Sequence, residues 1–102
     1  VWGGGLDTMT TLEDDVRPMY DALSTTPRHL AVVADAGHFS FTLLCDLLPG
    51  YDDCAPPIGD AAEIQVLTTT VTTAFLDLHR GFGEAAAWLP VDDPSLTFEG
   101  VE

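Results

Sequence analysis

The sequence contains no lysine. Three arginines are its only permanently cationic side chains, and seventeen acidic residues oppose them, which gives a formal net charge of −14. Nucleic acids and anionic membranes are bound through cationic side chains. The composition therefore excludes these two classes of partner and predicts an acidic, solvated surface. An acidic patch that recruits a basic partner is the alternative interpretation.

Long apolar runs are absent as well. No stretch approaches the roughly 20 apolar residues that cross a bilayer, and no signal-peptide pattern opens the chain, so we expect no membrane-spanning segment. An apolar fraction of 46% is that of a globular protein, and 102 residues suffice for one domain at most. The first residue is Val rather than Met, and it already lies near the end of a predicted strand. We therefore expect this chain to be a piece of a longer protein.

Cysteine is scarce too. Cys45 and Cys54 lie nine positions apart in a segment rich in proline and glycine. No second Cys or His pair completes a zinc pattern, so neither a metal nor a cofactor is predicted. A local disulfide is one interpretation, and it predicts a secreted or periplasmic protein. Two reduced, half-buried thiols in a cytoplasmic protein are the other.

Two short apolar segments, residues 1–6 and 30–34, are predicted strands. Continuous apolarity in the second indicates a strand covered on both faces, as in parallel sheets. Between them, helical spacing predicts a helix over residues 12–23, which begins at capping boxes around Thr10 and Thr11 and is kinked or restarted at Pro18. The order of elements predicts one parallel strand–helix–strand unit.

The rest of the chain is predicted to be mainly helical. Residues 39–48 predict a short helix, and Asp60 with Glu63 predicts the start of a long one. The long helix carries one apolar stripe, made of Ile64, Leu67, Val71, Ala74, Phe75 and Leu78. Residues 1–80 are thus expected to form an incomplete α/β domain, and residues 81–102 a tail with a short helical piece followed by coil. Because two strands alone make no stable parallel sheet, we expect further strands from outside this sequence.

Two residues with acid–base chemistry directly follow the two predicted strands. Asp7 comes after the glycines that end the first strand, and His38 comes after the turn that ends the second. Chemistry in open α/β sheets gathers at the carboxyl ends of the strands, and adjacent strands lie about 4.8 Å apart. A carboxylate that accepts from imidazole Nδ1–H leaves Nε2 free to take a hydroxyl proton. The sequence therefore predicts a catalytic acid–histidine pair.

The residues around this pair resemble a known family. A Gly-Gly-x-Asp-x-x-Thr-Thr stretch at 4–11, the 31-residue step from Asp7 to His38, and the segment Ala-Gly-His-Phe-Ser-Phe at 36–41 resemble the C-terminal end of α/β-hydrolases. With the cysteine-bearing loop and an Ala-Phe-Leu segment at 74–76, the chain looks most like bacterial dienelactone-hydrolase-like and platelet-activating-factor-acetylhydrolase-like esterases. The resemblance covers residues 1 to about 80.

The resemblance implies a serine hydrolase that acts on small carboxylic esters, with Asp7 as the triad acid and His38 as the general base. Phe39 and Phe41 are expected in the core, and either is a candidate for lining the acyl pocket. No Gly-x-Ser-x-Gly nucleophile motif occurs in the 102 residues, and Ser40 is expected to cap or pack. The chain alone is therefore expected to be inactive. The alternative is a non-catalytic acidic module that binds a basic partner; the sequence does not define an oligomeric state.

Overall fold

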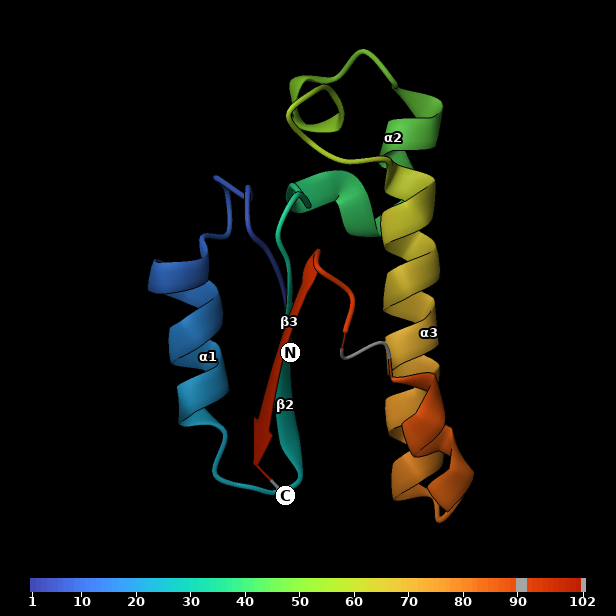
Figure 1. The fold of residues 1–102 in the computed structure, drawn as a ribbon. Coiled ribbons are helices and arrows are strands. Elements are labelled where there is room, and N and C mark those ends of the chain that lie inside the picture. Colours follow the sequence, from blue (N-terminus) through green and yellow to red (C-terminus); the bar gives the residue numbers. More distant parts are fainter. Residues whose placement is uncertain (90–91, 102) are drawn as a thin grey trace.

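The protein is a small α/β structure built in three layers. The computed structural model describes residues 1–89 and 92–101, and within them a sheet of three strands lies between two helices (Figure 1). The strands are β1 (Trp2–Gly4), β2 (Arg28–Val33) and β3 (Leu96–Val101), hydrogen-bonded in the order β1-β2-β3. Helix α1 (Arg17–Ala22) covers one face of the sheet, and helix α3 (Ala61–His79) covers the other.

The parallel pair and its crossover helix are as the sequence predicts. Strand β1 pairs with β2 in parallel, with Trp2 opposite Ala31. The crossover begins at Thr11, whose Oγ1 accepts from the Asp14 backbone N–H at 3.2 Å. A π-helical segment (Leu12–Val16) runs directly into α1, and Pro18 stands in the first turn of α1. Pro18 therefore restarts the helix, because its ring lacks the N–H that a helix interior needs.

The predicted coil near the C-terminus is wrong. Strand β3 runs antiparallel along the whole of β2, with Leu96 opposite Val33 and Val101 opposite Arg28. Leu96 and Phe98 pack towards the core beneath α3, while Glu99 pairs with Arg17 on α1. The sheet is thus mixed and has three strands, so β2 finds its second partner within this chain. The number of strands no longer argues for strands from elsewhere.

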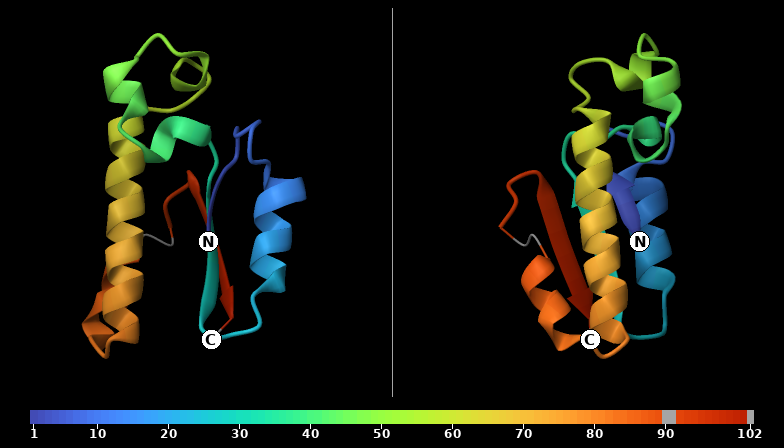
Figure 2. Two further views of the ribbon diagram at one scale, coloured as in Figure 1. Left: turned by 180° about the vertical axis from the view of Figure 1, so that it is seen from behind. Right: turned by 90° about the vertical axis from the view of Figure 1, so that its right-hand side faces the viewer.

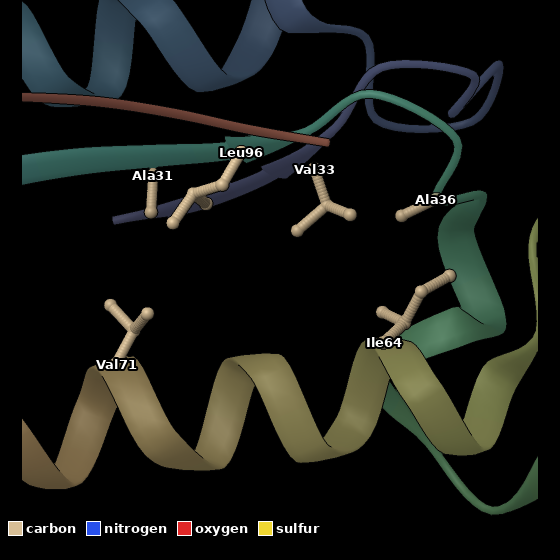
Figure 3. Packing of buried hydrophobic residues seen from close by; sticks show 6 residues of the cluster. All are labelled: Ala31, Val33, Ala36, Ile64, Val71 and Leu96. Atoms are coloured by element: carbon tan, nitrogen blue, oxygen red, sulfur yellow. The ribbon is translucent and has the colours of Figure 1, made fainter. Parts of the chain in front are cut away.

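Alternate residues of β2 face the two helices. Ala31 and Val33 join Leu96, Ala36, Ile64 and Val71 in a buried cluster between the sheet and α3 (Figure 3). Leu30 and Val32 point the other way and pack with Val16 and Tyr20. This confirms that the apolar part of β2, residues 30–33, is covered on both faces. Helix α3 begins as predicted, where the Asp60 carboxylate accepts from the Glu63 N–H at 3.1 Å.

The segment between β2 and α3 forms a cap over one end of the sheet (Figure 2). It contains a 3₁₀ turn (His38–Phe41), the short helix α2 (Leu44–Leu47) and a second 3₁₀ turn (Asp52–Cys54). A disulfide joins Cys45 and Cys54, whose Cα atoms are 5.3 Å apart. A last 3₁₀ helix (Gly83–Trp88) packs beside α3. Within the described residues, no helix has the length and apolarity to cross a membrane.

Candidate active site

The chain leaving β1 stays hydrogen-bonded to the turn that follows β2. Gly5 donates its N–H to the carbonyl of Val33 at 2.8 Å, and Leu6 donates to the carbonyl of Ala36 at 3.0 Å. These bonds carry the parallel pairing two residues beyond the end of β1. They bring the next residue, Asp7, beside the turn that carries His38.

Gly4 makes this close approach possible. A methyl group at Gly4 would lie 2.5 Å from the carbonyl oxygen of Ala36, a backbone atom that cannot yield without moving the turn. We therefore expect Gly4→Ala to lower the free energy of unfolding by about 1–3 kcal/mol, the usual effect of overpacking, as measured by urea denaturation. Gly50→Ala is the matched control, because no atom lies within 4 Å of the methyl it would add. Equal losses in the two variants would contradict the close-approach argument.

Asp7 and His38 form a direct pair. The Asp7 Oδ2 atom lies 3.0 Å from His38 Nδ1, across 31 residues of sequence. The other oxygen, Oδ1, accepts from the backbone N–H groups of Met9 at 2.8 Å and Thr10 at 2.9 Å. The Asp7 side chain is 7% exposed and that of His38 is 33% exposed. One oxygen therefore anchors the carboxylate to its own loop, and the other is left for the imidazole.

This environment keeps Asp7 ionised. Partial burial is the largest single influence and by itself raises the pKa of the carboxyl group. The hydrogen bond from the Thr10 N–H, the bond to His38, the bond from the Met9 N–H and attraction to the His38 ring act in the opposite direction and prevail. The pKa of Asp7 thus lies below its ordinary value of 3.8.

A lowered pKa makes stability depend on acid in a defined direction. Below pH 3.8 the unfolded chain takes up a proton at Asp7, while the folded chain still keeps this carboxylate ionised. The contribution of Asp7 to the free energy of unfolding is therefore complete above that pH. It is lost as the pH falls through the lower folded pKa. We expect the unfolding free energy of Asp7→Asn to fall less steeply than that of the wild type between about pH 5 and pH 2, by urea denaturation at a series of pH values. Parallel curves would show that Asp7 has no such linkage.

The turn that carries His38 is held from two sides. The hydroxyl of Ser40 is fully buried and accepts from the Gly37 N–H at 2.9 Å. Ser40 thus caps the turn, as expected. On the other side, the Phe39 N–H donates to Asp53 Oδ2 at 2.7 Å. The sequence analysis missed Asp53, because its contact with the turn depends on how the loop closed by the disulfide is folded.

The two phenylalanines of the turn have different surroundings. The Phe39 ring meets the His38 ring edge-on at 4.9 Å and the Tyr51 ring at 5.5 Å. Phe41 packs against the core and lies 6.2 Å from the Trp2 ring. Phe39 is thus the one in contact with the dyad, and Phe41 lies in the core as expected.

A cleft of about 630 Å³ separates the loop that carries Asp7 from the disulfide loop. Leu6 and Thr8, the chain neighbours of Asp7, line one wall. Asp53, which accepts the hydrogen bond from the Phe39 N–H, lines the other. The lining residues also include Tyr51, Asp52 and Ile58. Neither Asp7 nor His38 is among the residues that line this cleft, so it lies beside the dyad rather than over it.

The other two histidines lie at the opposite end of β2. The His29 ring stacks on Phe98 with centroids 5.1 Å apart. The ring of His79, in the last turn of α3, lies 5.9 Å from the His29 ring. Both rings make aromatic contacts at the end of β2 that lies away from the dyad. Across residues 1–89 and 92–101, no group of three or more His, Cys, Asp or Glu side chains is arranged to hold a metal ion.

Comparison of the chain with protein-family models, curated proteins and solved structures finds no significant match. The fold and the site therefore define a general class. This is a small α/β protein with a mixed sheet of three strands and a carboxylate–histidine pair at the carboxyl ends of its two parallel strands.

Proposed function

We propose that the chain supplies the acid and the general base of a serine hydrolase that cleaves carboxylic esters. The observation that carries the proposal is the 3.0 Å contact between Asp7 Oδ2 and His38 Nδ1, made between the loops that follow two adjacent parallel strands. This is the chain order and the strand-end position that the acid and histidine have in the α/β-hydrolases. The proposed protein belongs to that class, most like its dienelactone-hydrolase-like and platelet-activating-factor-acetylhydrolase-like esterases.

The dyad has one chemical task in this mechanism. Asp7, kept ionised by its hydrogen bonds, accepts the Nδ1–H of His38 and so leaves the Nε2 lone pair free. When a serine hydroxyl attacks the ester carbonyl carbon, its proton passes to Nε2, and Asp7 stabilises the imidazolium. Nε2 then returns the proton to the departing alkoxide. Water repeats the sequence and releases the acid.

The nucleophile lies outside these 102 residues in this proposal. No Gly-x-Ser-x-Gly motif occurs in the sequence, and Ser40 is buried with its hydroxyl already bonded to Gly37. The protein that turns over esters is therefore a longer one, of which this chain is the C-terminal part. The chain by itself is expected to be inactive.

The decisive experiment reads the coding sequence upstream of Val1 and expresses the longer protein. We expect a Gly-x-Ser-x-Gly motif, hydrolysis of a neutral p-nitrophenyl ester, and covalent labelling of that serine by a fluorophosphonate. A neutral ester is the appropriate probe because Asp52 and Asp53 line the cleft. A longer protein without this motif and without ester hydrolysis would overturn the proposal and leave the acidic binding module as the interpretation.

The disulfide supports an oxidising location for the protein. Such bonds persist in secreted and periplasmic proteins and are rare in the cytosol, and Cys45 is bonded to Cys54. We therefore propose a secreted or periplasmic protein. A thiol count on the purified protein, with and without reductant, is expected to give no free thiol until reductant is added.

A further inference from the structure

We infer that Asp53 is a positioning residue for His38, held in place by the Cys45–Cys54 disulfide. The inference rests on the proposed function for its catalytic meaning, but its structural content stands on contacts within this chain. Asp53 does not touch His38. It acts on the backbone of the next residue, where the Phe39 N–H donates to Asp53 Oδ2 at 2.7 Å.

On the side of the disulfide loop, the His38 turn is held by this hydrogen bond and by the ring contact between Phe39 and Tyr51. Gly37 is fixed by the buried Ser40 hydroxyl, which holds the start of the turn. Past His38, the backbone N–H of Phe39 points at the disulfide loop, where Asp53 accepts its hydrogen bond. A half-buried N–H with a charged acceptor makes one of the stronger hydrogen bonds in proteins. The orientation of the His38 ring towards Asp7 thus depends on the position of a carboxylate that lies fourteen residues beyond Phe39 in the sequence.

Gly37 provides a second, independent sign of this arrangement. Its backbone has φ −94° and ψ −175°, an extended conformation that any residue adopts. Glycine is therefore not required there by the backbone. A methyl group at Gly37 would instead lie 2.5 Å from Asp53 Oδ1 and 2.8 Å from its Cγ. The glycine leaves the space that the Asp53 carboxylate occupies.

The disulfide ties this carboxylate to the rest of the fold. Cys54 is the direct neighbour of Asp53, and its partner Cys45 lies in α2 and is buried. The ring contact between Tyr51 and Phe39 braces the same loop. Closing a short loop with a covalent bond removes most of its freedom to swing away. Asp53 is thus fixed at the distance at which it can hold the Phe39 N–H.

The test uses the 102-residue chain and nuclear magnetic resonance, so it needs no enzymatic turnover. Long-range ¹H–¹⁵N spectra report which nitrogen of the neutral His38 ring carries the proton. We expect Nδ1–H in the wild type, and a mixture of the two tautomers in Asp53→Ala. The Phe39 amide is expected to exchange with solvent roughly 10- to 100-fold faster in that variant, as the loss of a hydrogen bond to a charged acceptor implies.

Three further variants test whether the effect comes from the hydrogen-bond acceptor at residue 53, from its charge, or from a general change in the loop. Asp53→Asn keeps an acceptor for the Phe39 N–H without the charge and should retain the wild-type His38 spectrum. Gly37→Ala should reproduce Asp53→Ala, because its methyl group displaces the carboxylate. Asp52→Ala is the matched control. Asp52 is the exposed neighbour of Asp53, and within the part of the chain that the structure describes its side chain makes no hydrogen bond to the turn at 37–41. It should leave His38 unchanged.

Reduction tests the disulfide. One equivalent of a dithiol gives up two electrons and two protons, opens the Cys45–Cys54 bond to two thiols, and becomes a cyclic disulfide itself. We expect the reduced chain to show the same mixture of His38 tautomers as Asp53→Ala. An unchanged His38 spectrum after complete reduction would overturn the role of the disulfide.

The outcomes are decisive for Asp53. A folded Asp53→Ala chain with an unchanged His38 spectrum would overturn the inference. If Asp53→Ala does not fold, Asp53→Asn decides: the wild-type spectrum supports an acceptor role, and its loss overturns that role. None of these results depends on ester hydrolysis. A failure of the proposed function would appear in the longer protein as missing turnover, with the His38 spectra of this chain unaffected.

Discussion

His38→Ala is expected to abolish ester turnover by the longer protein proposed above while leaving its fold intact. Without the imidazole, no group takes the proton of the nucleophile or returns it to the leaving alkoxide. Removal of the histidine of such a triad lowers kcat by on the order of a millionfold. The His38 side chain is one-third exposed and lies outside the buried clusters, so little packing is lost. Steady-state hydrolysis of a p-nitrophenyl ester, with circular dichroism for the fold, measures both parts.

His79→Ala is the matched control for this prediction. His79 also makes an edge-on aromatic contact, with Phe75 at 4.5 Å, but it lies beside His29 at the other end of β2. The six residues of β2 place it roughly 20 Å from the dyad. We expect this variant to keep its turnover. Full activity in His38→Ala would remove His38 from the mechanism, and comparable losses in both variants would indicate a general effect on folding.

Asp7→Asn should lower kcat by about 10⁴-fold, although the side chain keeps its size. The reason lies in how the carboxylate oxygens are shared. The oxygen of the new amide accepts from the N–H groups of Met9 and Thr10, which donate to Asp7 Oδ1 in the wild type. The amide nitrogen must then face His38 and donate to Nδ1. This places the ring proton on Nε2, where it blocks acceptance of the proton from the nucleophile.

Asp93→Asn controls for the loss of a charge in a loop. Asp93 also accepts from a backbone N–H two residues on, at Ser95, and hydrogen bonds from Ser95 hold its pKa below the ordinary value. It has no contact with the dyad, so we expect turnover to be unchanged. Near-normal kcat in Asp7→Asn, with the variant folded, would show that the tautomer argument is wrong and that Asp7 serves the loop only.

The parts of the fold that local patterns determine could be predicted from the sequence. The unbroken apolar run at 30–34 indicates a strand buried on both faces, and β2 has helices on both sides. The placement of Asp7 and His38 after consecutive parallel strands sufficed to predict that they meet. The cysteine spacing left two interpretations open, and the structure has the disulfide.

Contacts that depend on distant segments could not be predicted in this way. The alternation of Leu96 and Phe98 with Thr97 and Glu99 is a strand signal, but it is only four residues long and is followed by glycine. Its stability comes from pairing with β2, about 65 residues earlier in the sequence. Asp53 gives no signal of its own, since one carboxylate among seventeen acidic residues carries no information until the loop is closed.

Strand β3 also has a consequence for solubility. β2 is apolar along most of its length, and without β3 its outer row of N–H and C=O groups would be open to pairing with a second molecule. β3 covers that row, in a chain that carries a net charge of −14. Such a net charge makes the molecules repel one another and discourages association. Shortened versions that end before residue 96 would therefore leave the edge of β2 unpaired and prone to aggregation. This is a practical reason to retain the last residues when the protein is produced.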